Sequence, residues 1–174
     1  YVSPDRITEI ADSLVSLQMA DGGWNLSGAY SDADVTAMAL QALSAVRSYG
    51  YEDNIQKGVG RLASLQKDDA GYASYGVNNS ESTAQVLMAL CALNIDYRTD
   101  TRFIKNGHTV LDALMGYRTS EGAFSHTKDG KSNALATTQA LGALVCADNY
   151  EKHGTFIYRY GNIQSRPVQK ETQP

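Results

Sequence analysis

The sequence has 174 residues, of which 43% are hydrophobic and 20% charged, a composition typical of one globular domain and not of a disordered or fibrous chain. Its net charge of −4 at neutral pH argues against a nucleic-acid partner, because binding to a phosphate backbone needs an excess of Lys and Arg. The longest apolar runs, such as 86–93, are shorter than the roughly 18 residues that identify a membrane span, so no membrane span is predicted.

The first predicted element is a surface helix that begins at Pro4. Ser3 is a favourable N-cap residue, and proline is favoured at the first helical position. Apolar residues then recur at intervals of three and four, with charged residues on the opposite side, and the apolar positions are Ile7, Ile10, Ala11, Leu14 and either Leu17 or Met19. One face of this helix should therefore pack against the core.

The second predicted helix, over 35–46, differs because it is apolar on nearly every side and rich in alanine. Two later segments share this composition, 84–93 and 134–147. A helix that is apolar all round is usually a buried one. Each of the three segments follows a residue suited to capping it, and these residues are Asp32, Asn79 and Asn133.

These helices belong to a repeat in which an amphipathic helix, a turn ending in an aromatic residue and an apolar helix follow one another three times. The aromatic residues are Trp24, Tyr72 and Phe124, at intervals of 48 and 52 residues. A threonine in each apolar helix gives a similar period, and these are Thr36, Thr83 and Thr137. Two columns with one period predict three helix pairs, in which outer amphipathic helices surround inner buried ones. The third outer helix is expected over 101–118.

No segment shows sustained strand alternation, and proline occurs only at positions 4, 167 and 174, so the predicted fold class is all-α. The helix pairs are expected over 1–160, and 161–174 is expected to be a polar linker or tail within a longer polypeptide. Cys91 and Cys146 lie in apolar runs and are predicted to be buried thiols. The three histidines are scattered along the chain, so no metal site is predicted, and no cofactor is predicted either.

The order of residues in the repeat resembles that of the squalene-cyclase and prenyltransferase superfamily, because Gln18 precedes a Gly-Gly-Trp turn at Trp24 and Gln66 precedes a Gly-Tyr turn at Tyr72. The resemblance implies an α/α toroid, here a partial ring of three helix hairpins with inner and outer layers. It also implies that the glutamine and the aromatic residue connect an outer helix to the next repeat. The open ends would be covered by other domains of the same polypeptide or by a second copy that completes the ring.

Within this superfamily, the segment Asp-Val-Thr-Ala-Met-Ala at 34–39 is similar to inner helices of the transcobalamin and intrinsic-factor group. That resemblance implies a ligand-binding or scaffolding module of a secreted or cell-surface bacterial protein, with a corrinoid or another small molecule as its ligand. Candidate ligand-binding residues lie in and beside the loops that lead into the inner helices, where tyrosine offers a flat apolar ring with a polar tip. They are Tyr30, Asp32, Tyr75, Glu81 and His126.

A second interpretation is enzymatic, because Asp32-Ala33-Asp34 resembles the start of the Asp-x-Asp-Asp motif of class II terpene cyclases. The resemblance makes Asp34 the general acid that protonates an alkene, although Val35 replaces the third aspartate. A structural interpretation competes with it, since Asp32 suits an N-cap and the helix dipole favours an acid in the first turn. We favour a binding module over an enzyme. A third interpretation is that the repeats only hold other domains apart.

Overall fold

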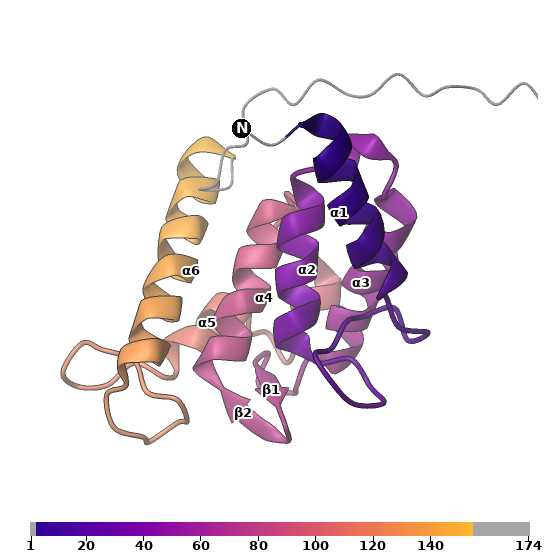
Figure 1. Cartoon of the computed structure of the whole chain (residues 1–174). Helices are drawn as coiled ribbons and strands as arrows, with labels where there is room; N and C mark the ends of the chain where they lie inside the picture. Colours follow the sequence, from indigo (N-terminus) through magenta and orange to yellow (C-terminus); the bar gives the residue numbers. More distant parts are fainter. Residues whose placement is uncertain (1–2, 155–174) are drawn as a thin grey trace, which may run out of the picture.

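The structure is a computed structural model that describes residues 3–154 of the chain. The fold of this part is mostly helical, as predicted, and Figure 1 shows its elements. The helices are α1 (Pro4–Ser16), α2 (Ala33–Ser44), α3 (Glu52–Leu65), α4 (Ser80–Ala92), α5 (Val110–Met115) and α6 (Ala134–His153), with short 3-10 turns η1 (Arg47–Tyr49) and η2 (Thr101–Phe103). Strands β1 (Tyr72–Ser74) and β2 (Val77–Asn79) form an antiparallel hairpin.

Three helices form a row through the molecule. Helix α4 lies in the middle and packs against α2 on one side and α6 on the other, and all three begin at the lower end of the view (Figure 1). We call α2, α4 and α6 the row helices. Helix α3 packs against α2, and α5 packs against α4, so we call α1, α3 and α5 the flanking helices.

The three row helices start with the same cap. The backbone N–H of Val35 donates to Asp32 at 2.8 Å, that of Ser82 to Asn79 at 2.7 Å, and that of Ala136 to Asn133 at 3.0 Å. The predicted caps are thereby confirmed. Ser3 caps α1 by accepting from the backbone N–H of Arg6, with Pro4 at the first helical position, also as predicted.

The threonine column holds the aromatic column in place. The hydroxyl oxygens of Thr36, Thr83 and Thr137 accept the backbone N–H of Trp24, Tyr72 and Phe124, at 2.9, 3.1 and 3.0 Å. A buried N–H without an acceptor is costly, so this bond explains why each repeat carries a threonine at that position.

The glutamines of the first two repeats connect each repeat to the next. The side-chain amide of Gln18 donates to the backbone oxygen of Asn54 in α3 at 2.9 Å, and that of Gln66 donates to the backbone oxygen of Phe103 in η2 at 2.9 Å. In the third repeat the corresponding residue is Arg118. The glutamine positions therefore have a structural role.

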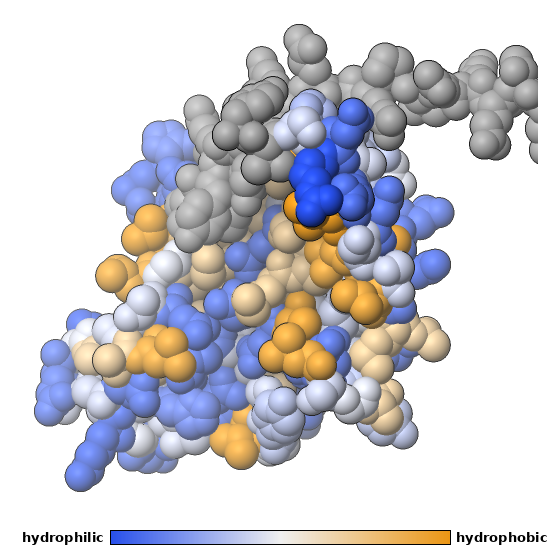
Figure 2. Space-filling model, in the orientation of Figure 1, coloured by the Kyte–Doolittle hydropathy of each residue, from blue (hydrophilic) through white to orange (hydrophobic). Residues whose placement is uncertain are grey.

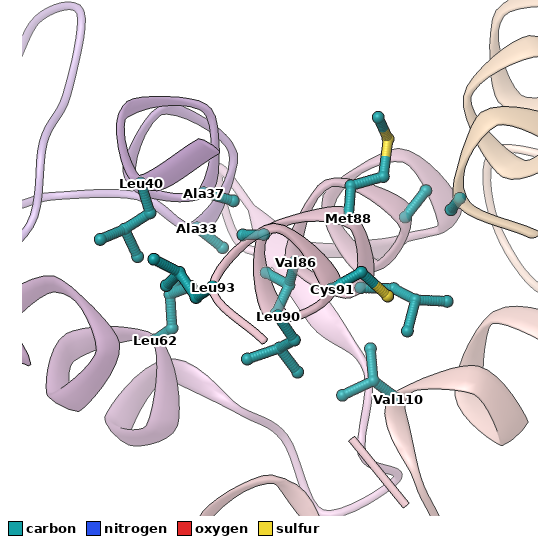
Figure 3. Packing of buried hydrophobic residues seen from close by; sticks show 14 of the residues in the cluster. Ala33, Ala37, Leu40, Leu62, Val86, Met88, Leu90, Cys91, Leu93 and Val110 are labelled. Carbon is teal, nitrogen blue, oxygen red and sulfur yellow. The ribbon is translucent and has the colours of Figure 1, made fainter. Parts of the chain in front are cut away.

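Helix α4 forms the centre of the core, because neighbours cover it on most sides. Its residues from Ala84 to Cys91 are buried apart from Gln85. Figure 3 shows Leu40, Leu62 and Leu93 pointing toward one another where α2, α3 and the end of α4 meet. Cys91 and Cys146 are both buried thiols, which confirms that prediction.

Three features differ from the sequence-based predictions. Helices α2 and α6 are not buried all round, because each has a row neighbour on one side only, and Met38 and Val145 are exposed. The predicted outer helix over 101–118 is wrong: only 101–103 and 110–115 are helical, since Asn106 and Gly107 adopt positive φ in a turn bridged by Lys105 and His108. The β1–β2 hairpin was not predicted, because three-residue strands are too short to show alternation. The predicted tail at 161–174 lies outside the described residues.

Candidate functional site

The candidate site lies at the end of the row where α2 and α4 begin. Asp34 and Glu81 occupy the same place in the repeat, two residues before the column threonine, and each is the acid in the first turn of its helix. The hairpin β1–β2 leads directly into α4, and the loop that carries His126 reaches the same end. Residues from three different repeats therefore meet there.

Asp34 is a partly buried residue. Its Oδ1 atom is buried and has no hydrogen-bond partner among residues 3–154. Burial raises the pKa of Asp34, and the nearby carboxylates of Asp32 and Glu81 raise it further, while the hydroxyls of Ser82 and Ser74 oppose the rise. The side chain therefore holds its proton at a higher pH than an ordinary aspartate does.

Ser82 adds a second unsatisfied group beside Asp34. Its hydroxyl oxygen is buried and, within the described part of the chain, also lacks a hydrogen-bond partner. A buried polar atom without a partner costs about 1–3 kcal/mol, and native structures contain few of them. The Ser82 hydroxyl nevertheless lowers the pKa of Asp34 as a hydrogen-bond donor does, so the two groups face each other, and a bound molecule that donates to Asp34 would compete with this serine.

Glu81 and His126 form the second part of the site. Glu81 Oε2 lies 2.9 Å from His126 Nδ1 and accepts a hydrogen bond from Ser80 Oγ at 3.0 Å. The backbone N–H of Ser80 donates to the backbone oxygen of His126 at 3.0 Å, which fixes the loop against the start of α4. The Glu81 side chain is 12% exposed and that of His126 is 52% exposed, so the imidazole faces solvent.

Asp32 belongs to the same cluster, but its carboxylate is already used by the cap of α2. The two other predicted ligand residues are more peripheral. Tyr30 and Tyr75 are among the most exposed large side chains of the described chain. Tyr75 lies in the turn of the hairpin with a positive φ. Tyr72, in contrast, is a core residue and does not join the loop tyrosines.

The sequence pattern did not identify Ser74 and Ser82 as site residues. It also did not predict a second contact that holds the loop carrying His126. Lys128 Nζ lies 2.8 Å from Asp69 Oδ2 and 5.7 Å from the centre of the Tyr117 ring. Asp69 belongs to the turn of the second repeat and Lys128 to the third. The pairing joins loops that are far apart in the chain, and no local pattern announces such a contact.

Within 3–154, no group of three or more His, Cys, Asp and Glu side chains is placed to hold a metal ion. None of the helices described there is both long and apolar enough to cross a membrane.

The sequence matches no protein-family model and no curated protein.

Proposed function

We propose that the chain is a ligand-binding module of the α/α-toroid type from a secreted or cell-surface bacterial protein. The three helix pairs would form part of a ring, with α2, α4 and α6 as its inner layer and the flanking helices as its outer layer. The repeated bonds between threonine and aromatic residues, and the glutamine bonds between repeats, support this arrangement.

The carboxyl of Asp34, which lies near Glu81 and the hydroxyls of Ser82 and Ser74 and whose Oδ1 atom has no hydrogen bond of good geometry within residues 3–154, is the observation that carries the proposal. A ligand that donates a hydrogen bond there, through an amide, hydroxyl or ammonium group, would complete the hydrogen bonding of this carboxyl. Glu81 and the exposed His126 ring offer further polar contacts beside it. A corrinoid, whose rim carries amide groups, is one ligand with suitable donors.

The test is a calorimetric titration of the purified chain with cyanocobalamin, together with mass spectrometry of any small molecule that copurifies. Asp34→Ala and Glu81→Gln should each weaken binding about tenfold or more, which corresponds to one lost hydrogen bond to a charged group. Asp53→Ala is the matched control, because Asp53 is also an acid in the first turn of a helix but is exposed. If the wild type neither binds cyanocobalamin nor retains a small molecule, the proposal is overturned and a spacer role is favoured.

A second candidate function is acid catalysis of the terpene-cyclase kind. The raised pKa of Asp34 supports it, because a general acid must still hold its proton at the working pH. Incubation with squalene or geranylgeranyl diphosphate, followed by product analysis, separates the two functions. Turnover by the wild type that is lost in Asp34→Asn would establish an enzyme. If no product forms, the proposal of a binding module stands.

A further inference from the structure

The third repeat contains an open groove that is filled in the first two repeats. The groove encloses about 330 Å³ beside the start of α6, and its walls include Met115, Arg118, Phe124, Thr137, Leu141 and Leu144. Its walls are largely apolar, with Arg118 as the one charged residue among them. An apolar groove of this kind is expected to be covered by another surface.

The repeat shows what fills the same groove elsewhere. Leu141 follows its column threonine by four residues, as Leu40 and Leu87 follow theirs. Leu40 and Leu87 are fully buried, whereas Leu141 is 60% exposed. The cover over Leu40 is helix α3: a Cβ atom added at Gly58 would lie 2.9 Å from the Leu40 side chain and 3.0 Å from the Trp24 ring. Within residues 3–154, no flanking helix follows the equivalent groove of repeat three.

Helix α1 has the same apolar pattern as α3. The two helices can be aligned by counting back from Gln18 in the first repeat and from Gln66 in the second. The apolar positions of α1 then match those of α3, with Ile7, Ile10, Ala11 and Leu14 at the positions of Ile55, Gly58, Val59 and Leu62. All four of the α3 residues are buried. Of the α1 residues only Ala11 is buried, and Ile10 is 57% exposed. The apolar face of α1 is therefore only partly covered within one copy.

The sizes of the side chains also match. In the filled groove a large ring, Trp24, meets a glycine, Gly58. In the open groove the smaller ring of Phe124 would meet Ile10, so that the loss of volume on one side is offset by a gain on the other. Close packing of this kind is what a stable contact requires.

The same apolar face of α1 lines a pocket at the end of the row opposite α6. This mainly apolar pocket of about 250 Å³ lies between α1 and α2, and its walls include Ile7, Ile10, Ala11, Leu14, Ala42 and Val46. Figure 2 shows apolar atoms at the surface over α1 and α2 and again over α6. The two ends of the row thus both carry an apolar surface, and the surface at α1 is made of different residues from the groove beside α6.

We propose that the chain associates head to tail with a second copy of itself, with α1 of one copy lying in the groove of the other beside α6. The contact repeats the one that α3 makes with α2 inside each copy. Because the two surfaces differ, the contact is heterologous, and it either closes into a ring or continues as a chain of copies. It needs no ligand, so it stands or falls independently of the proposed function.

The test is the mass of the full chain in solution, measured by size-exclusion chromatography with light scattering. The wild type should have a multiple of the monomer mass of 18.8 kDa. Leu141→Asp and Ile10→Lys should each give the monomer, since a charge would be buried in the apolar contact. Both residues are exposed in a single copy, so the circular dichroism spectra of the two variants should match that of the wild type. Leu26→Asp, at an exposed loop residue that lines neither the groove nor the α1–α2 pocket, should associate like the wild type.

Mixing the two monomeric variants gives the decisive result. Ile10 of one copy is expected opposite Leu141 of the next, so Asp and Lys would face each other in one contact while the other contact is wild type. The mixture should therefore regain the associated mass. A monomeric wild type, variants that still associate, or a mixture that stays monomeric would overturn the proposal. A monomeric wild type that Leu141→Asp destabilises would instead show that the same copy covers the groove.

Discussion

At the scale of single residues, Asp34 links the stability of the fold to pH. The pKa of Asp34 is raised by burial above its ordinary value of 3.8, so the folded state binds this proton more tightly than the unfolded state does. The contribution is fully present below pH 3.8 and is lost as the pH rises through the raised pKa. Ionised Asp34 is therefore a cost to the fold near neutral pH.

Asp34→Asn should remove this pH dependence. We expect the variant to gain stability relative to the wild type as the pH rises from 4 to 7, and to differ little at pH 3.5, as measured by thermal unfolding across that range. Asp53→Asn should show no such gain, because its side chain is exposed at the start of α3. A variant that is less stable than the wild type at pH 7 would mean that the helix dipole outweighs the burial of the charge.

Gly22 shows a second effect at this scale. Its φ is +90°, and an added Cβ atom would lie 2.8 Å from the backbone oxygen of Lys57. Gly22→Ala should therefore cost about 2 kcal/mol or more, from backbone strain and the clash together. Ala70 has the equivalent position in the second repeat and tolerates a methyl group because its φ is 61°, which lies within the left-handed region.

Gly60→Ala is the control for Gly22→Ala, and both are measured by denaturant unfolding. Gly60 lies in α3, where an added Cβ meets no atom within 4 Å. Alanine there should stabilise the chain by about 0.5–1 kcal/mol, because glycine loses more backbone freedom in a helix. Equal effects of the two changes would contradict the close approach of Gly22 to α3.

At the scale of elements, burial of the row helices depends on the number of neighbours each one has. Leu87 in α4 is fully buried, so Leu87→Ala should cost about 2–5 kcal/mol. Leu141→Ala, at the equivalent and exposed position of α6, should cost less than about 1 kcal/mol in a single copy. Both are best measured by denaturant unfolding in the Ile10→Lys background. Similar losses for the two leucines would show that α6 is covered within one chain.

The elements that the sequence predicted well depend on local rules. The caps at Asp32, Asn79 and Asn133 follow from the preference of the first helical turn for a side-chain acceptor. The start of α1 at Pro4 follows from the same kind of rule. The aromatic and threonine columns were visible as a period, and the hydrogen bonds between them explain why both columns have it.

The elements that were missed depend on contacts between distant segments. Composition shows that α2 and α6 can be buried, but it does not give the number of helices around them. The pairing of Glu81 with His126 depends on the bond that ties the loop to Ser80. Each residue was predicted to belong to the site, whereas the contact between them was not. The position of Ser74 near Asp34 depends on a hairpin too short to be predicted.

At the scale of the whole molecule, head-to-tail association makes stability depend on concentration. A partner that binds only the folded chain stabilises it, by about 2.7 kcal/mol when its concentration is a hundred times the dissociation constant. For a domain of this size, each kcal/mol shifts the unfolding temperature by about 2–4 °C. Dilution of the wild type through its dissociation range should therefore lower the unfolding temperature by several degrees.

Leu141→Asp should abolish the effect of dilution, because the charged side chain prevents the contact while leaving the single copy folded. Its unfolding temperature should equal that of the fully diluted wild type at every concentration, as followed by scanning fluorimetry. A concentration effect that persists in Leu141→Asp would show that the copies meet through another surface. A wild-type unfolding temperature that stays constant on dilution, in a chain of monomer mass, would mean that the groove of the third repeat remains open to solvent or is covered from within.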